Sequence, residues 1–232
     1  MSTPNESKHQ VISATAKAVR LYAPILENFG APKLAQLTEC NAPDVPEWQN
    51  HLATTILNSV FLGIEFEPLI QRYLLNFMRR METAVSEYRL GRATLQSYVD
   101  ELPKRNNHFL SALRALSHFE QSAAALYQAA MLTEPVTKQK PFQKGDKSPM
   151  ERLNMIYNRS KHFEEGVRQQ AMPPATPVWL INEGLECSLG TLSFADFHEI
   201  ILDLTKCAEA IAVELPKLIE ERRKAADQTK KV

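Results

Sequence analysis

The longest uninterrupted helical pattern in this sequence follows Pro103 and continues to about Leu132. Apolar side chains recur there every three or four residues, a spacing that collects them on one face of an α-helix. They are Phe109, Leu113, Leu116, Ala123, Tyr127 and Ala130. A helix with one apolar face must pack against neighbours, so a chain with several such segments is expected to fold as an all-α helical bundle.

The amino-acid composition agrees with this fold class. The chain has 232 residues, of which 44% are apolar and only 7 are glycine, a profile typical of a globular protein rich in helices and poor in tight turns. A chain of this length can bury a sizeable core. We therefore expect a single helical domain over residues 1–232.

Proline and glycine residues divide the chain into about six helices and one short β-hairpin near residues 178–188. Gly184 lies in the expected turn of that hairpin, and Gly63 and Gly91 lie where two helices would end. A connection is expected over residues 38–46. The expected helices cover residues 6–29 with a kink at Pro24, 48–62, 68–90, 103–132, 149–169 and, after Ser193, a helix with the stripe Phe197, Ile201, Leu204, Ala208, Ile211, Leu215 and Leu218.

Two helix starts carry capping signals. Ser148 precedes Pro149 and lies three residues before Glu151, and Ser193 lies three residues before Asp196. A serine hydroxyl at such a position accepts a hydrogen bond from a backbone amide of the first turn, and a glutamate three residues later returns one. Both signals predict that a helix begins immediately after the serine.

Two segments are expected to lie outside the packed helices. Residues 133–148 contain Pro135, Pro141, Gly145 and four lysines, which predicts a flexible loop. This loop is either a partner-binding segment or a merely solvated connector. Residues 220–232 are expected to form a charged C-terminal tail.

Charge and cysteine content narrow the class of protein. Lysine plus arginine and aspartate plus glutamate both number 27, so the net charge is zero and any nucleic-acid site must be local. The three cysteines, Cys40, Cys187 and Cys207, are far apart and form no CxxC pair, which indicates free thiols in a reducing compartment. Residues 1–10 lack the apolar core of a secretory signal, and no window approaches the roughly 20 apolar residues of a membrane span. We therefore expect a soluble cytoplasmic protein with no membrane partner.

The helix expected after Pro149 carries the chemically most useful side chains. At about 100° per residue, Asn158 and His162 lie nearly in line and opposite the apolar stripe, and Arg159 lies only about 60° from His162. The stripe consists of Met150, Leu153, Ile156, Tyr157, Phe163 and Val167. We therefore expect Asn158, Arg159 and His162 to point outward together.

These three residue types suit phosphate chemistry. An exposed imidazole such as His162 can take a proton from a ribose hydroxyl or give one to a leaving oxygen. The guanidinium of Arg159 can hold a phosphate by two hydrogen bonds, and Asn158 can orient the imidazole or the ligand. The same residues also suit an ordinary solvated helix face, and the sequence leaves both interpretations open.

On this helix the sequence resembles the HEPN superfamily, small all-α proteins that are often metal-independent ribonucleases. The family signature is an arginine followed after four to six residues by a histidine, frequently with an asparagine directly after the arginine. Asn158 and His162 match the asparagine and the histidine in identity and spacing. Tyr157 occupies the place of the family's arginine, and Arg159 lies on the other side of the asparagine.

The resemblance implies an RNA- or nucleotide-binding protein that works without a metal or other cofactor. In this interpretation His162 is the general acid or base, Arg159 clamps the phosphate and Asn158 orients them. The resemblance further implies a homodimer with the site at a two-fold interface, and a prokaryotic toxin–antitoxin or phage-defence setting. The alternative is a non-catalytic helical scaffold that dimerises or docks on a protein partner.

Other signatures of chemistry are weaker. Arg114 and His118 lie four residues apart and can imitate the same pairing, but they adjoin the buried stripe of their helix. The Glu-x-x-His pattern of di-iron bundles is missing before these histidines: His108, His118, His162 and His198. The sequence also lacks a glycine-rich phosphate loop and a Gly-x-Ser-x-Gly elbow, which argues against familiar kinases, hydrolases and dinucleotide enzymes.

Overall fold

The computed structural model describes a mostly helical chain with a small antiparallel sheet. It describes residues 36–48, 51, 53–55, 68–102, 109–168, 176–214, 217, 220, 221 and 224. The helices are α4 (Pro68–Glu101), α5 (Phe109–Thr137), α6 (Pro149–Lys161), α7 (Phe163–Arg168) and α8 (Phe194–Glu209), which continues as a π-helical turn over Ala210–Glu214. The strands are β1 (Val178–Ile181), β2 (Gly184–Cys187) and β3 (Gly190–Ser193), in the order β1-β2-β3.

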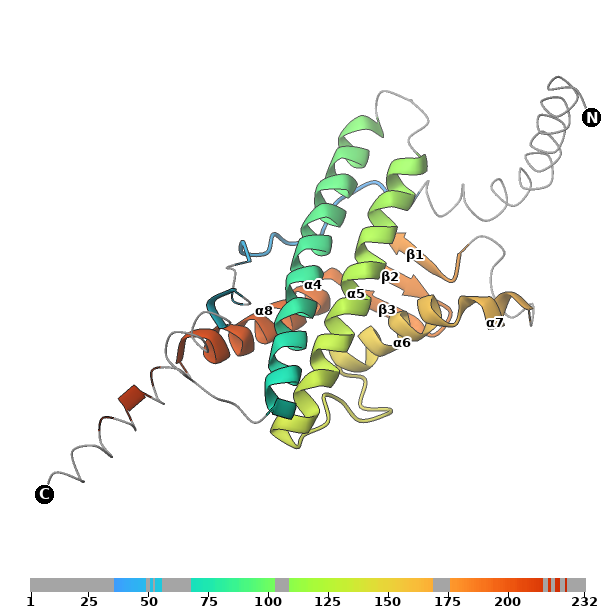
Figure 1. The fold of residues 1–232 in the computed structure, drawn as a ribbon. Coiled ribbons are helices and arrows are strands. Elements are labelled where there is room, and N and C mark those ends of the chain that lie inside the picture. The colour runs from blue at the N-terminus through green and yellow to red at the C-terminus, as the bar shows by residue number, and fades with distance from the viewer. Residues whose placement is uncertain are drawn as a thin grey trace, which may run out of the picture.

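The long helices α4 and α5 form an antiparallel pair that makes the most extensive contact in the fold (Figure 1). Helix α8 crosses this pair and contacts both of its members. The sheet and α6 pack on the side of α5 away from α4, and α7 extends outward from the end of α6 (Figure 1). The prediction of a mostly helical fold is thus confirmed, and the small sheet is an additional layer.

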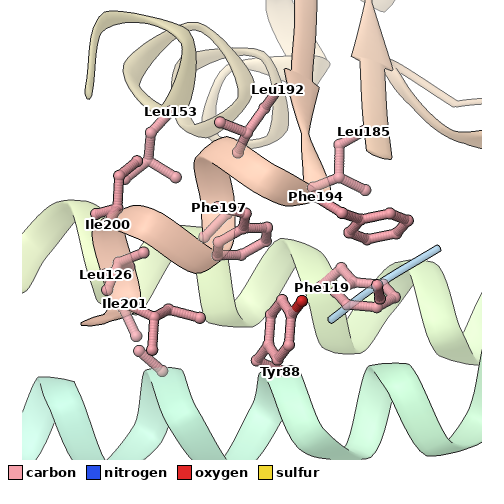
Figure 2. Packing of buried hydrophobic residues seen from close by; sticks show 14 of the residues in the cluster. Tyr88, Phe119, Leu126, Leu153, Leu185, Leu192, Phe194, Phe197, Ile200 and Ile201 are labelled. Atoms are coloured by element: carbon pink, nitrogen blue, oxygen red, sulfur yellow. The ribbon is translucent and has the colours of Figure 1, made fainter. Parts of the chain in front are cut away.

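Four aromatic rings fill the centre of the core where α4, α5 and α8 meet. Tyr88 lies with its ring centroid 5.5 Å from that of Phe119 and 5.2 Å from that of Phe197, in edge-to-face geometry. Phe194 adds a tilted contact to Phe119 at 5.0 Å. Figure 2 shows these rings among the aliphatic side chains that surround them. Edge-to-face pairs stabilise a core beyond the area they bury, so this cluster fixes how the three helices cross.

Helix α4 is longer than the sequence pattern indicates. The expected end at Gly91 is wrong, because the helix continues for ten further residues to Glu101. Gly91 is buried, and a Cβ atom there would lie 3.2 Å from the ring of Phe119. The glycine therefore permits close approach of α4 and α5 instead of ending a helix.

The expected hairpin over residues 178–188 is confirmed, but a third strand follows it. Strand β3 pairs with β2 through the register Gly184↔Ser193 to Cys187↔Gly190. A four-residue strand is too short to show a clear alternation, and Ser193 is more conspicuous as a helix cap. Gly184 has φ +155°, and a Cβ atom there would lie 2.1 Å from the carbonyl oxygen of Leu192, so only glycine fits between β1 and β3.

Both predicted caps are present at the serine. The hydroxyl of Ser148 accepts a hydrogen bond from the amide of Glu151 at 3.2 Å, and that of Ser193 accepts one from the amide of Asp196 at 3.0 Å. The expected return bond from Glu151 is wrong, since the amide of Ser148 donates to Asp146 at 2.8 Å instead.

The carboxylate of Glu151 holds the preceding loop. It accepts hydrogen bonds from the amides of Gly145 at 2.5 Å and Lys147 at 2.8 Å, and the residue is only 5% exposed. The loop itself begins at Lys138 and not at residue 133, because α5 continues to Thr137.

Residues 37–48 form an irregular segment, as their prolines predict. Side-chain hydrogen bonds attach this segment to the rest of the fold. The side-chain oxygen of Asn182 in the β1–β2 turn accepts hydrogen bonds from the amides of Thr38 and Glu39 at 2.9 and 3.1 Å. Arg92 of α4 donates to the carbonyl of Ala42 at 2.9 Å, and Tyr88 to that of Pro43 at 3.1 Å. Three buried side chains of this segment, Leu37, Ala42 and Val45, join the core.

Several expectations fall on residues outside those described. These are the helix over residues 6–29 with its kink, the end of the helix over 48–62, the start of the 103–132 helix, and Leu215 and Leu218. In the expected tail only residues 220, 221 and 224 are described, and each is helical.

The three cysteines are free thiols. Among the described helices none is long and apolar enough to cross a membrane.

Candidate functional site

The candidate site lies at the C-terminal end of α6, where the helix stops one residue short of His162. His162 caps the helix with φ −107° and ψ 25°, and its amide donates to the carbonyl of Asn158 at 3.0 Å. The expected continuous helix to residue 169 is therefore interrupted, and α7 begins only at Phe163. Because the backbone leaves helical geometry here, the angles of an ideal helix do not give the direction of the imidazole.

The imidazole of His162 is exposed, as predicted, and so is the neighbouring Lys161. Lys161 places its ammonium 5.6 Å from the centre of the Tyr157 ring. Two basic residues in the last turn, Arg159 and Lys161, also stabilise the carbonyl end of the helix dipole. A purely structural reason for this cluster thus exists beside the chemical one.

Arg159 does not stand freely in solvent. Its side chain is half-buried, and its Nε atom is closed off from solvent without an acceptor in the part of the chain that the structure describes. A buried guanidinium N–H that lacks an acceptor is unfavourable. An anion that approaches Arg159 from solvent must bind the terminal nitrogens of the guanidinium and not Nε.

Asn158 is also half-buried and faces its own helix. Its amide nitrogen donates to the side-chain oxygen of Asn154, one turn earlier, at 2.8 Å. No described hydrogen bond joins Asn158 to the His162 ring, so the two contact each other only through the backbone cap. The expected orienting role of Asn158 stays a prediction.

The apolar stripe of α6 is only partly buried. Leu153 and Ile156 are buried as expected, and Tyr157 is half-buried in a stacked pair with Tyr127 of α5, with ring centroids 4.5 Å apart. Phe163 was expected on the same face but is 44% exposed, because the break at His162 rotates α7 out of register with α6. The side chain of Val167 lies outside the described residues.

Two of the four basic residues of α6 and α7, Arg152, Arg159, Lys161 and Arg168, are only partly exposed, which limits the positive patch that they can form. Arg152 turns away from solvent and makes a two-pronged ion pair with Asp196 of α8, with N–O distances of 3.1 and 2.8 Å. Arg159 is half-buried, which leaves Lys161 and Arg168 as the exposed cations of the patch.

A polar pair that the sequence does not reveal lies beside this helix end. The hydroxyl of Ser160 donates to the carboxyl group of Glu120 on α5 at 2.6 Å. Burial raises the pKa of Glu120, and the hydrogen bond from Ser160 offsets part of that effect. The two residues are 40 positions apart, so only the packing of α5 against α6 brings them together.

The Glu120–Ser160 pair lies in a cavity of about 520 Å³ between α5 and the end of α6. Tyr157, Lys161 and Phe163 also line it. The cavity thus combines a carboxyl group, a hydroxyl group, an ammonium group and aromatic surface, and two of its lining residues, Lys161 and Phe163, are the chain neighbours of His162. These are the groups that bind the ribose, phosphate and base of a nucleotide.

The alternative pair Arg114 and His118 is not brought together as a site. His118 lies with its Nδ1 atom 2.7 Å from a carboxylate oxygen of Glu87 on α4. This contact is partly buried and joins the two long helices. Arg114 is exposed one turn away.

No group of three or more histidine, cysteine, aspartate or glutamate side chains suited to a metal ion is found among the described residues. Comparison with known proteins gives no relative either, since no protein-family model, curated protein or solved structure matches this chain.

Proposed function

We propose that this protein binds RNA at the C-terminal end of α6 and cleaves it without a metal ion, with His162 as the proton-transferring residue. The observation that carries the proposal is the position of His162, exposed beyond the last turn of α6 and next to the exposed Lys161. An exposed imidazole can reach a substrate proton, whereas a structural histidine is usually hydrogen-bonded or buried. The HEPN-like spacing of Asn158 and His162 supports the same assignment.

The reaction that fits these groups is attack of a ribose 2′-hydroxyl on the adjacent phosphate. His162 takes the proton of the hydroxyl, the new O2′–P bond forms, and the P–O5′ bond breaks as the leaving oxygen receives a proton. The products are a cyclic phosphate and a 5′-hydroxyl. One imidazole cannot serve as base and acid in the same step, so the second proton comes from His162 of a second copy across a two-fold interface.

The cationic side chains stabilise the charge that develops on the phosphate. Lys161 and Arg168 are exposed, and the terminal nitrogens of Arg159 complete the set. Charge-assisted hydrogen bonds to a phosphate are roughly twice as strong as neutral ones. Tyr157 replaces the family's arginine, and its ring lies under the Lys161 ammonium, so Lys161 serves in place of the missing guanidinium.

An RNA-cleavage assay in the presence of a chelator tests this proposal. We expect the wild-type protein to cleave single-stranded RNA and His162→Ala to lose activity by about 10²-fold or more, as for removal of a general base. His198→Gln is the matched control, because His198 is bonded to the carbonyl of Asp44 at 3.1 Å on another face. Unchanged cleavage by His162→Ala would exclude the site. RNA binding without cleavage would indicate a non-catalytic binding protein, and absence of both would favour the scaffold alternative.

A further inference from the structure

A second cavity continues the first along α5. It measures about 480 Å³ and is lined by Tyr127, Met131 and Glu134 of α5 and by residues 140–144 of the loop before α6. The stacked rings of Tyr127 and Tyr157 stand between the two cavities, each ring lining one of them. In Figure 1 the loop joins the end of α5 to the start of α6, which packs against α5 at an angle.

The α5 residues that line both cavities form one continuous stripe. Their positions are separated by three or four residues, which places them on one face of the helix. Six of the seven α5 residues that line one cavity or the other follow this spacing, and the seventh is Gln121; the six are Ser117, Glu120, Ala124, Tyr127, Met131 and Glu134. From the first to the last of them the helix rises about 26 Å at 1.5 Å per residue. The two cavities therefore lie one after the other along one face of α5, on either side of the Tyr127–Tyr157 stack, and we call the two together the α5–α6 groove.

Exposed lysines stand at both ends of this groove. Lys140 and Lys144 line the half near the loop, and Lys161 lines the half near His162. Glu134 and Glu120 are the acidic residues of the lining, and burial raises the pKa of Glu120. Because the whole chain has zero net charge, this excess of lysines is a local feature.

Aromatic and hydroxyl groups lie between these charges. Phe142 lines the half near the loop, and Phe163, 44% exposed, lines the half near His162. The Ser160 hydroxyl and the Glu120 carboxyl group offer a donor and an acceptor at hydrogen-bonding distance from each other. Cations that follow a groove interleaved with aromatic rings are the arrangement that binds single-stranded nucleic acid.

We propose that the α5–α6 groove binds single-stranded RNA and leads it to His162. Lys140, Lys144 and Lys161 hold phosphates, the exposed ring of Phe163 stacks on a base, and the Ser160–Glu120 pair bonds a ribose hydroxyl. At a stacked rise of 3.4 Å per nucleotide, a length of about 26 Å holds about seven nucleotides, and fewer when the strand is stretched. This inference rests on the proposed function and assigns the path of its substrate.

Fluorescence anisotropy with a labelled oligouridine of about eight nucleotides tests the groove, with every protein carrying His162→Ala so that the RNA is not cleaved. The double variant Lys140→Ala/Lys144→Ala is compared with Lys206→Ala/Lys217→Ala, which removes two exposed lysines that line neither cavity. We expect the groove variant to bind at least about tenfold more weakly and the control to bind like the wild type. Loss of two phosphate contacts should also flatten the plot of log affinity against log salt by about 1.4.

The outcomes separate the groove from the site at His162. If both double variants weaken RNA binding equally, the groove is not the binding site. The proposed function still holds in that case if RNA cleavage depends on His162. A wild-type protein that neither binds nor cleaves RNA overturns both. Circular dichroism of each variant verifies that its helices are folded, so weak binding is not mistaken for unfolding.

Two further comparisons examine the stacking and ribose contacts. Phe163→Ala should weaken binding about tenfold, as expected for loss of one base–aromatic stack. Leu189→Ala is its matched control, because Leu189 is similarly exposed at 54% and lies in the β2–β3 turn. An oligodeoxyuridine that binds as tightly as the RNA, or a Phe163 variant that binds no more weakly than the Leu189 variant, contradicts the proposal.

Discussion

At the scale of single residues, Glu120 has the environment least expected from its position. It lies between two apolar positions of the α5 stripe, Leu116 and Ala123, and faces α6 instead of solvent. Burial of an acidic group disfavours its charged form, and here the Ser160 hydroxyl is the hydrogen-bond donor that partly offsets this. The pair is therefore a polar group in an interface that otherwise packs aromatic and aliphatic side chains.

Replacement of Glu120 by glutamine should stabilise the protein at neutral pH. Because folding raises the pKa of Glu120, the protonated carboxyl group contributes stability that is fully present below the pKa of a glutamate in the unfolded chain, near 4.3. This contribution is lost as the pH rises through the higher folded-state pKa. Glutamine keeps the acceptor for Ser160 without the charge. We expect Glu120→Gln to raise the free energy of unfolding at pH 7 by up to about 1 kcal/mol and to leave it unchanged near pH 4.

Urea denaturation of the wild type and Glu120→Gln at the two pH values measures this difference. Gln121→Glu, which places a carboxylate at the next, exposed position, is the control for added or lost charge on α5. A gain of equal size at both pH values would show that the stabilisation does not arise from ionisation of Glu120.

The sequence predicts the role of a single residue correctly where the partner of that residue is close in the chain. The capping serines, Ser148 and Ser193, act within three residues of their partners, and both were predicted correctly. The exposure of His162 was also predicted. The Glu120–Ser160 pair and the Tyr127–Tyr157 stack were not, because each joins residues 30 or more positions apart and depends on how α5 and α6 pack.

At the scale of elements, the sequence does not distinguish the different structural roles of its glycines. Gly184 was expected in the hairpin turn but is the first residue of β2, paired with Ile181, and its positive φ and close contact with Leu192 require glycine there. Gly91 has the same identity but serves helix packing, since it lies under the ring of Phe119 within α4. A glycine that ends a helix and a glycine that permits close packing look alike in one sequence, and the difference is decided by the neighbouring helix.

Replacement of Gly91 by alanine should destabilise the protein despite the better helix propensity of alanine. Alanine is favoured over glycine inside a helix by about 1 kcal/mol. The added Cβ would, however, lie 3.2 Å from ring atoms of Phe119, which is fully buried among other rings and cannot move aside. Overpacking of a core costs about 1–3 kcal/mol, so we expect a net loss of about 1 kcal/mol in thermal or urea unfolding.

The same change in a Phe119→Leu background tests the cause of this loss. The smaller side chain leaves space for the new methyl group, so Gly91→Ala should there be neutral or stabilising by up to about 1 kcal/mol. Equal destabilisation in both backgrounds would mean that the contact with Phe119 is not the reason.

At the scale of the whole molecule, side-chain bonds join parts that are distant in sequence. Asn182 holds the amides of Thr38 and Glu39, and Arg152 of α6 holds Asp196 of α8. The helical class and the hairpin were predictable, because their periodicities are local and strong. The third strand, the break after Lys161 and these cross-connections were not, because they depend on tertiary packing.

The Arg152–Asp196 pair provides a pH-dependent test of the packing of α6 on α8. Although burial alone raises the pKa of Asp196, the hydrogen bonds from Arg152 and Ser193 and the charge of Arg152 outweigh it and lower that pKa. A lowered pKa contributes stability that is present above the unfolded-state value, near 3.9, and is lost as the pH falls through the folded-state value. The side chains are 30% and 20% exposed, so solvent screens the pair only in part.

We therefore expect Asp196→Asn to lower the free energy of unfolding by about 1–2 kcal/mol at pH 7, and by progressively less as the pH falls below about 4 and the wild-type carboxylate takes up its proton. Urea denaturation across this range measures the change. Asp203→Asn is the matched control, because Asp203 makes an exposed ion pair with Lys206 on the same helix, a kind of pair that contributes little. A loss for Asp196→Asn that stays constant down to pH 3, or one matched by the control, would show that this pair does not hold α6 to α8 by its charge.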